Sequence, residues 1–75
     1  MITLGGTATK VHLATAATDL RRGYSGLYNL IEHEFGGEPM SGHLWVFANK
    51  RRDMVKVFWW DDGGMCILGK RLHEG

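Results

Sequence analysis

The chain has 75 residues, 44% of them hydrophobic, and its 9 Lys and Arg against 8 Asp and Glu give a formal net charge of +1. This length excludes a second core, and a domain of this size buries only about 60% of the surface of its unfolded chain. The near-neutral charge excludes a globally basic protein, so a nucleic-acid partner has to be inferred from where the cations lie.

The first half of the chain predicts one short strand and one helix. Residues 1–9 are rich in Gly and Thr and favour no element, whereas Val11–Leu13 is a short β-like run. Thr18 or Asp19 is a suitable helix N-cap, and Gly36 with Gly37 is a typical helix end. Between them, apolar residues at helical spacing predict a helix over residues 20–35: Leu20, Tyr24, Leu27, Tyr28, Ile31 and Phe35.

The second half predicts a three-stranded antiparallel meander. Apolar and aromatic runs at residues 43–48, 54–60 and 65–68 are separated by two polar breaks, Asn49–Asp53 and Asp61–Gly64. The first break has three consecutive cations at its centre, and the second has the composition of a tight hairpin turn. We therefore expect a single small α+β domain with the order β-α-β-β-β, in which the meander packs on one helix.

Alternation within these runs predicts two largely apolar sheet faces. A tip loop of Asn49–Asp53 would set Ala48 opposite Met54 and Trp45 opposite Val57. One face would then carry Trp45, Phe47, Val55, Val57 and Trp59, and the other Leu44, Val46, Ala48, Met54, Lys56, Phe58 and Trp60. The helix covers one face, and an uncovered aromatic face usually marks a partner site. Alternatively, the N-terminal strand or a second copy of the chain covers it.

The cations form one candidate site, for DNA. A two-stranded ribbon with a cationic tip can enter a groove or follow phosphates, although the same charges would also keep a sheet edge soluble. The candidate DNA-contacting residues are Lys50, Arg51 and Arg52 at the tip, Lys56 on the next strand, Arg21 and Arg22 in the first turn of the predicted helix, and Lys70 and Arg71 at the end of the last strand.

Aromatic side chains form a second candidate site, for a protein partner. Trp and Tyr are frequent hot-spot residues of interfaces. An adaptor that binds another protein or a second copy of itself would use the residues Trp45, Phe58, Trp59 and Trp60. The near-neutral net charge favours this alternative over pure DNA binding.

Catalysis, metals and membranes are disfavoured by the remaining residues. The side chains of Asp61 and Asp62 diverge, and the four histidines lack metal-ligand spacing. Cys66, the single cysteine, lies in an apolar run, cannot form an intramolecular disulfide, and is expected to be a buried small hydrophobe. The first residues do not resemble a signal peptide, and no apolar run approaches the ~20 residues needed to cross a bilayer. We expect a cytoplasmic protein with no catalytic residue, metal, cofactor or membrane partner.

An ordered set of short motifs covers most of the chain from Val11 onward. They are Val11-His12-Leu13, residues 18–24 with Gly26 and Leu27, Pro39–Gly42, Leu44–Phe47 with residues 49–51, Val55–Val57 with Trp60 and Asp61, Gly64, and Lys70–Leu72 with Glu74 and Gly75. With these spacings the chain resembles the TnpB (Orf2-like) accessory proteins of the insertion-sequence-66 transposon family. The resemblance implies a non-catalytic role in transposition beside a separate, larger transposase, with transposon-end DNA and the transposase as partners. It also implies that residues 1–75 form a single accessory domain, apparently without the C-terminal tail usual in the family.

Overall fold

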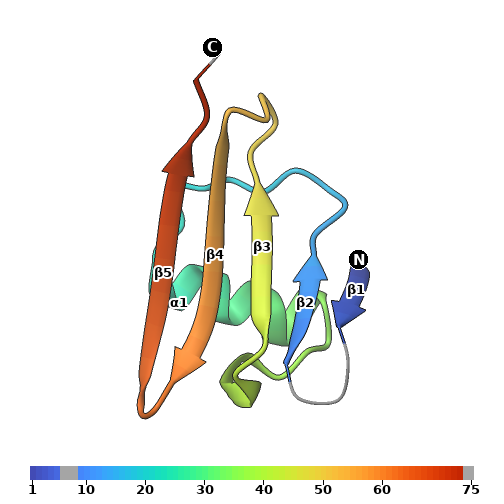
Figure 1. Ribbon diagram of the computed structural model, residues 1–75, viewed down its shortest axis with the longest axis vertical. Coiled ribbons are helices and arrows are strands. Elements are labelled where there is room, and N and C mark those ends of the chain that lie inside the picture. Colours follow the sequence, from blue (N-terminus) through green and yellow to red (C-terminus); the bar gives the residue numbers. More distant parts are fainter. Residues whose placement is uncertain (6–8, 74–75) are drawn as a thin grey trace.

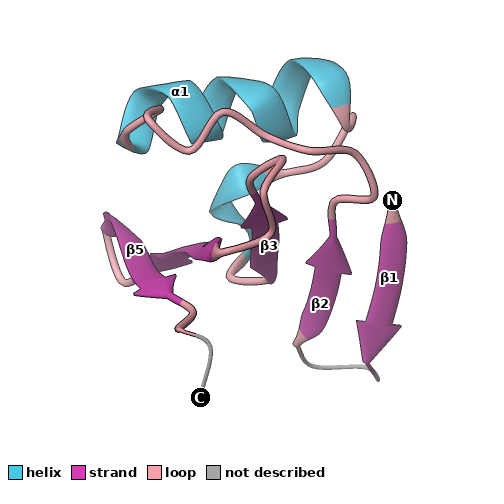
Figure 2. Ribbon diagram, turned by 90° about the horizontal axis from the view of Figure 1, so that it is seen from above, coloured by secondary structure: helices cyan, strands magenta, loops and turns pink. Residues whose placement is uncertain are grey.

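One helical layer covers one face of a five-stranded sheet in the computed structural model, which describes residues 1–5 and 9–73 (Figure 1, Figure 2). The strands follow their sequence order across the sheet: β1 (Ile2–Gly5), β2 (Lys10–Leu13), β3 (Leu44–Ala48), β4 (Met54–Asp61) and β5 (Gly64–Arg71). β2 and β3 run parallel, and the other three pairs are antiparallel. The predicted α+β class and the meander on a helix are confirmed. β1, in a stretch that predicted no element, adds an edge strand.

The helical layer forms the crossover that joins the two parallel strands, as such a pair requires. It consists of α1 (Tyr24–Asn29), which continues directly into a π-helical turn, η1 (Leu30–Glu34). A short 3-10 turn, η2 (Pro39–Ser41), then leads into β3. The helix ends as predicted, because Gly36 adopts a positive φ of 63° and the Gly37 N–H donates to the carbonyl of Ile31.

The helix begins later than predicted, at Tyr24 instead of Leu20. Residues before it form a turn in which the Arg22 N–H donates to the Asp19 carbonyl. The Lys56 Nζ donates to the carbonyl of Leu20 at 2.6 Å, which gives that carbonyl a partner outside any helix. Gly23 is therefore the N-cap and not an interior residue, and Arg21 and Arg22 precede the helix.

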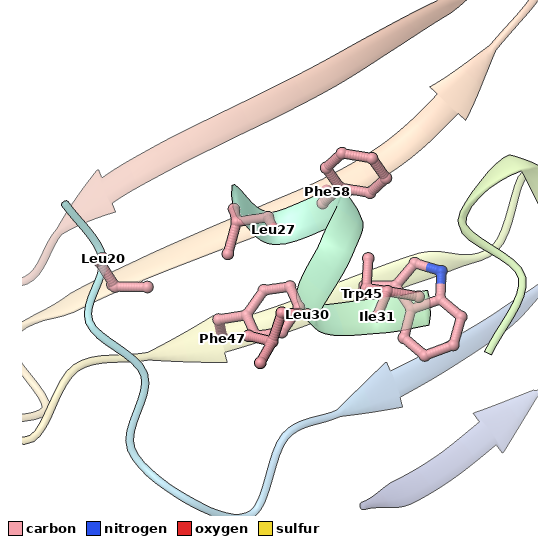
Figure 3. Close-up of a cluster of buried hydrophobic side chains, with 7 residues drawn as sticks. All are labelled: Leu20, Leu27, Leu30, Ile31, Trp45, Phe47 and Phe58. Atoms are coloured by element: carbon pink, nitrogen blue, oxygen red, sulfur yellow. The ribbon is translucent and has the colours of Figure 1, made fainter. Parts of the chain in front are cut away.

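Seven buried apolar side chains form the core between the helix and the sheet (Figure 3). Leu27 and Ile31 project from the helix toward Trp45, Phe47 and Phe58 of the sheet, and all five are at most 3% exposed. The core is completed by Leu20 and Leu30. Leu30, three residues after Leu27, is buried as well, whereas Tyr24, which was predicted to face the sheet, is the first residue of the helix and is 51% exposed.

The pairing between β3 and β4 differs from the prediction by one residue. Ala48 pairs with Val55 and Trp45 with Phe58, because the Asn49 N–H donates to the Met54 carbonyl and sets Asn49 opposite Met54. A one-residue slip moves every side chain of β4 to the other face. Phe58 therefore joins Trp45 under the helix, and Val55, Val57 and Trp59 face away from it.

The face away from the helix, called the open face below, is apolar across all five strands. Figure 1 looks onto it, with the helix behind the sheet. By the alternation of side chains and the observed pairings, it carries Ile2, Leu4, Val11, Leu13, Leu44, Val46, Ala48, Val55, Val57, Trp59, Cys66 and Leu68, with Lys70 and Asp61 at opposite ends. β1 and β2 extend this face instead of covering it, so the alternative that the N-terminal strand covers it is wrong.

Two histidines join β1, β2 and the start of β3 on the helix side. The His12 ring stacks on Trp45 at 3.9 Å between ring centroids, shares a 2.9 Å hydrogen bond between its Nε2 and His43 Nδ1, and a second between its Nδ1 and Thr3 Oγ1. One of the two rings must accept in the shared bond, so two protonated rings would set N–H against N–H. Burial, and then the charges of His43 and Lys10, hold the pKa of His12 below its ordinary value of 6.5.

The contact between Gly37 and Trp45 generates a stability prediction. A Cβ at Gly37 would overlap the Trp45 ring, which the core holds in place. We expect Gly37→Ala to lower the free energy of unfolding by about 1–3 kcal/mol, as other overpacked sites do. Gly69→Ala is the control, because its Cβ would approach no atom closer than 3.9 Å. Urea unfolding of both variants measures this, and equal effects would contradict the proposed contact.

The histidine pair generates a pH prediction. The unfolded chain protonates His12 near pH 6.5, whereas the folded chain does so only at lower pH, so the unfolded state binds more protons as the pH falls below 6.5. We expect the free energy of unfolding to decrease from pH 7.5 toward pH 5, in the range set by this pKa, and His12→Gln to reduce that decrease. His33→Gln, at an exposed position, should retain it. Identical pH profiles for the three chains would refute the assignment to His12.

Candidate nucleic-acid interface

The loop between β3 and β4, called the tip below, is held in its conformation by hydrogen bonds among its own residues. The Asn49 side-chain oxygen accepts from the backbone N–H groups of Asp53 and Met54, and its Nδ2 donates to Asp53 Oδ1 at 2.7 Å. Arg52 N–H donates to the Asn49 carbonyl. These bonds close the base of the loop, so Lys50, Arg51 and Arg52 lie at its exposed end.

Arg52 holds an uncommon backbone conformation at this end. Its φ is 57°, in the left-handed region that costs most L-residues about 1–2 kcal/mol and that Gly or Asn adopts more easily. The tip therefore retains a cation where an uncharged residue would be less strained.

Asp53 ties the tip to the end of β5. Its Oδ2 lies 3.9 Å from Arg51 Nε and 3.9 Å from Arg71 Nη1, and its carbonyl accepts from the Leu72 N–H. The hydrogen bond from Asn49, helped by the two guanidinium groups, holds the pKa of Asp53 below its usual range. A single carboxylate thus lies among several cations at one end of the sheet.

The charges along the sheet are segregated by end. The tip and the end of β5 contribute Lys50, Arg51, Arg52, Lys70 and Arg71, which are five of the nine Lys and Arg. The turn between β4 and β5 lies at the other end of these strands (Figure 1), where Asp61 is the last residue of β4 and Asp62 follows it in the turn. This turn is the predicted tight hairpin, with positive φ at Asp62 and Gly63. These five cations and the one carboxylate, Asp53, give four net positive charges at this end of the sheet. We call these six residues the basic end.

A groove of about 630 Å³ separates the tip from the turn before α1. It is lined by Arg21, Lys50 and Arg51 together with the apolar side chains of Ala17, Leu20 and Met54. Arg21 does not act as a free cation there, because its guanidinium donates to both oxygens of Asp19 and those bonds lower the pKa of that carboxyl to about 2.

Comparison with known proteins identifies the family. A family model described as "IS66 Orf2 like protein" matches residues 9–75. The chain belongs to the IS66 Orf2-like family. This confirms the resemblance found in the sequence.

Two curated proteins of Sinorhizobium fredii are similar to this IS66 Orf2-like chain. The uncharacterized protein y4hO is 34% identical over 70 residues, and the uncharacterized protein y4jC is 35% identical over 66. The alignments cover 93% and 88% of the chain but 61% and 56% of these relatives, so the chain spans about three fifths of their length. No solved structure matches the chain.

The structure brings together part of the predicted DNA-contacting set of this IS66 Orf2-like protein. Lys50, Arg51, Arg52 and Arg71 gather at the basic end, and Lys70 lies there on the open face. Lys56 is a correction, because its half-buried ammonium donates to the carbonyls of Leu20 and Arg22 and is not available to a phosphate. Arg22 lines a separate hollow beside Glu34 and Phe35, away from the tip.

The predicted aromatic interface is wrong in half of its residues. Trp45 and Phe58 are core side chains, 3% and 0% exposed, because the observed register turns both toward the helix. Trp59 lies on the open face. Trp60 lines a groove of about 400 Å³ on the helix side with Tyr28, Met40 and Met65. The four residues therefore do not form one surface.

Two residues that organise the site were missed as functional residues. The sequence pattern marks Asn49 and Asp53 only as the ends of the polar tip, yet they bond to each other and set its shape. The available signal was the pair itself, since Asn and Asp readily bond to nearby backbone in turns.

Among residues 1–5 and 9–73, no cluster of three His, Cys, Asp or Glu could hold a metal ion. Within the same residues, no helix is both long and apolar enough to span a bilayer.

The conformation of Arg52 generates a third prediction. Asn tolerates positive φ better than Arg, so Arg52→Asn should raise the free energy of unfolding by about 0.5–1 kcal/mol although it removes a surface cation. Lys50→Asn removes the same charge from the same loop without relieving positive φ, and should not stabilise the fold. Urea denaturation compares the two variants. An equal change in both would show that charge, not backbone strain, sets the effect.

Proposed function

We propose that this IS66 Orf2-like protein assists transposition by contacting the DNA backbone, including transposon ends, through its basic end. The observation that carries this proposal is the segregation of charge: four net positive charges at one end of a chain whose total is only +1. Such a local concentration is the electrostatic footprint of a phosphate-binding surface.

The geometry of the tip supports this proposal. Asn49 and Asp53 fix the loop from within, so the three tip cations are held on a rigid hairpin. A rigid β-ribbon loses less conformational freedom on binding than a loose loop does, and ribbons enter grooves or follow phosphates in known complexes. The strained backbone of Arg52 is a further indication that its charge has a use.

A second candidate function is that of an adaptor for the transposase. It is favoured by the groove around Trp60, where Met40 and Tyr28 offer apolar surface to a protein segment. Met and aromatic side chains are frequent at binding surfaces that accept such segments. In this alternative the basic end is only a solvated sheet end.

The DNA proposal predicts a salt dependence that separates the two functions. About four phosphate contacts should give a slope of log affinity against log salt near −3.6, and Arg51→Ala with Arg52→Ala should reduce its magnitude by about 2. Fluorescence anisotropy of labelled transposon-end duplex, and of an unrelated duplex, at several salt concentrations measures both.

The matched control removes two cations elsewhere. Lys10 lies at the far end of β2 and Arg22 beside the helix, so Lys10→Ala with Arg22→Ala changes net charge equally and should leave the slope unchanged. Equal losses in the two double variants would refute a contact at the basic end. No binding at low salt would favour the adaptor.

A further inference from the structure

We propose that the open face is the interface of a homodimer, in which two copies pack sheet against sheet with their strands antiparallel. This inference does not rest on DNA contact by the basic end, although it uses Lys70, which lies at that end. It begins from an asymmetry of burial: among the described residues, every buried apolar side chain of the core lies on the helix side of the sheet, in the helical layer or in the turn before it.

The open face has the alternating apolar pattern of a buried sheet face, but the side chains at its edges are exposed in a single copy. Leu68 at its β5 edge is 60% exposed, and Ile2 and Leu4 at its β1 edge are 51% and 54% exposed. In β1 these apolar side chains alternate with Thr3, which bonds to His12 on the helix side. Strict alternation of this kind is typical of a strand with one buried face. All four residues of β1 are nevertheless exposed in the single copy.

The size of the face fits a second copy. Strands of four, four, five, eight and eight residues, at a rise of ~3.3 Å and a spacing of ~4.8 Å, give roughly 460 Å² of sheet plane per copy. Two copies would remove roughly 900 Å² of plane, and more of accessible surface because side chains stand out from it, which reaches the ~1,000 Å² expected of a biological interface. Two sheets packed face to face in this way form a sandwich with an apolar core.

The charges of Lys70 and Asp61 favour one relative orientation of the two copies. The alternation that puts Leu68 on the open face also puts Lys70 there at the basic end, and Asp61 there at the opposite end of the neighbouring strand. A two-fold axis in the plane between the sheets and perpendicular to the strands places β5 over β5 with reversed direction. Lys70 of each copy then approaches Asp61 of the other, whereas parallel strands would not match these charges.

The composition of the open face also suits a two-fold symmetric dimer. Closed two-fold dimers are the commonest soluble assemblies, and their interfaces use the same patch on both partners. Apart from Lys70 and Asp61 at its ends, the open face carries no charged residue among those assigned to it, so two copies meet without repulsion at the centre.

Sedimentation equilibrium of the chain from micromolar to near-millimolar concentration tests the proposal. The wild-type chain should sediment as a reversible monomer–dimer system. Leu68→Lys, at a position already exposed, should raise the dimer dissociation constant ~tenfold or more while leaving the circular dichroism spectrum unchanged. Met65→Lys is the matched control, on the same strand but on the helix side, and should dimerise as before.

A charge exchange tests the orientation. Lys70→Glu and Asp61→Lys should each weaken the dimer several-fold, and the two together should restore it because opposite signs face each other again. A wild-type chain that is monomeric at every concentration, or a dimer insensitive to Leu68→Lys, would overturn the interface. A Leu68-dependent dimer that the combined exchange does not restore would overturn the antiparallel arrangement.

Discussion

The pairing register between β3 and β4 is the constraint on which the rest of this structure depends. Because side chains alternate along a strand, the choice between Met54 and Val55 as the partner of Ala48 decides which aromatic residues form the core. The bonds made by Asn49 at the tip make that choice. They place Phe58 against Leu27 and Ile31, and they leave Trp59 on the opposite side. The same short loop therefore shapes the core and presents the cations.

The basic end illustrates how topology, not composition, creates a charged surface. The tip and the end of β5 are separated by about twenty residues of sequence, and the antiparallel pairing of β4 with β5 brings them together. The same pairing sends the acidic turn to the far end of the strands. A net charge near zero is thus the sum of two opposed ends, and a total taken over the whole chain conceals both.

Much of this fold could be predicted from the sequence, and the failures have identifiable physical causes. The meander, its two turns and the end of the helix follow from strong local signals, such as the Asp-Gly turn and paired glycines. The start of the helix could not be predicted, because the Lys56 ammonium, 36 residues away from Leu20, binds the carbonyls of the preceding turn. The same contact takes Lys56 out of the candidate site. The register could not be predicted either, since loop lengths that differ by one residue fit the same apolar runs, and the β1 strand depends on pairing more than on its own composition.

The parallel pairing of β2 with β3 has a consequence for how the chain assembles. The contacts of β3, β4 and β5 close short loops, whereas β2 meets β3 only across a crossover of about thirty residues. On a ribosome, the N-terminal hairpin would emerge first and yet have no sheet to join until β3 has also been synthesised. The first strands of this chain to be synthesised therefore join the sheet only after the helical layer and β3 have followed them.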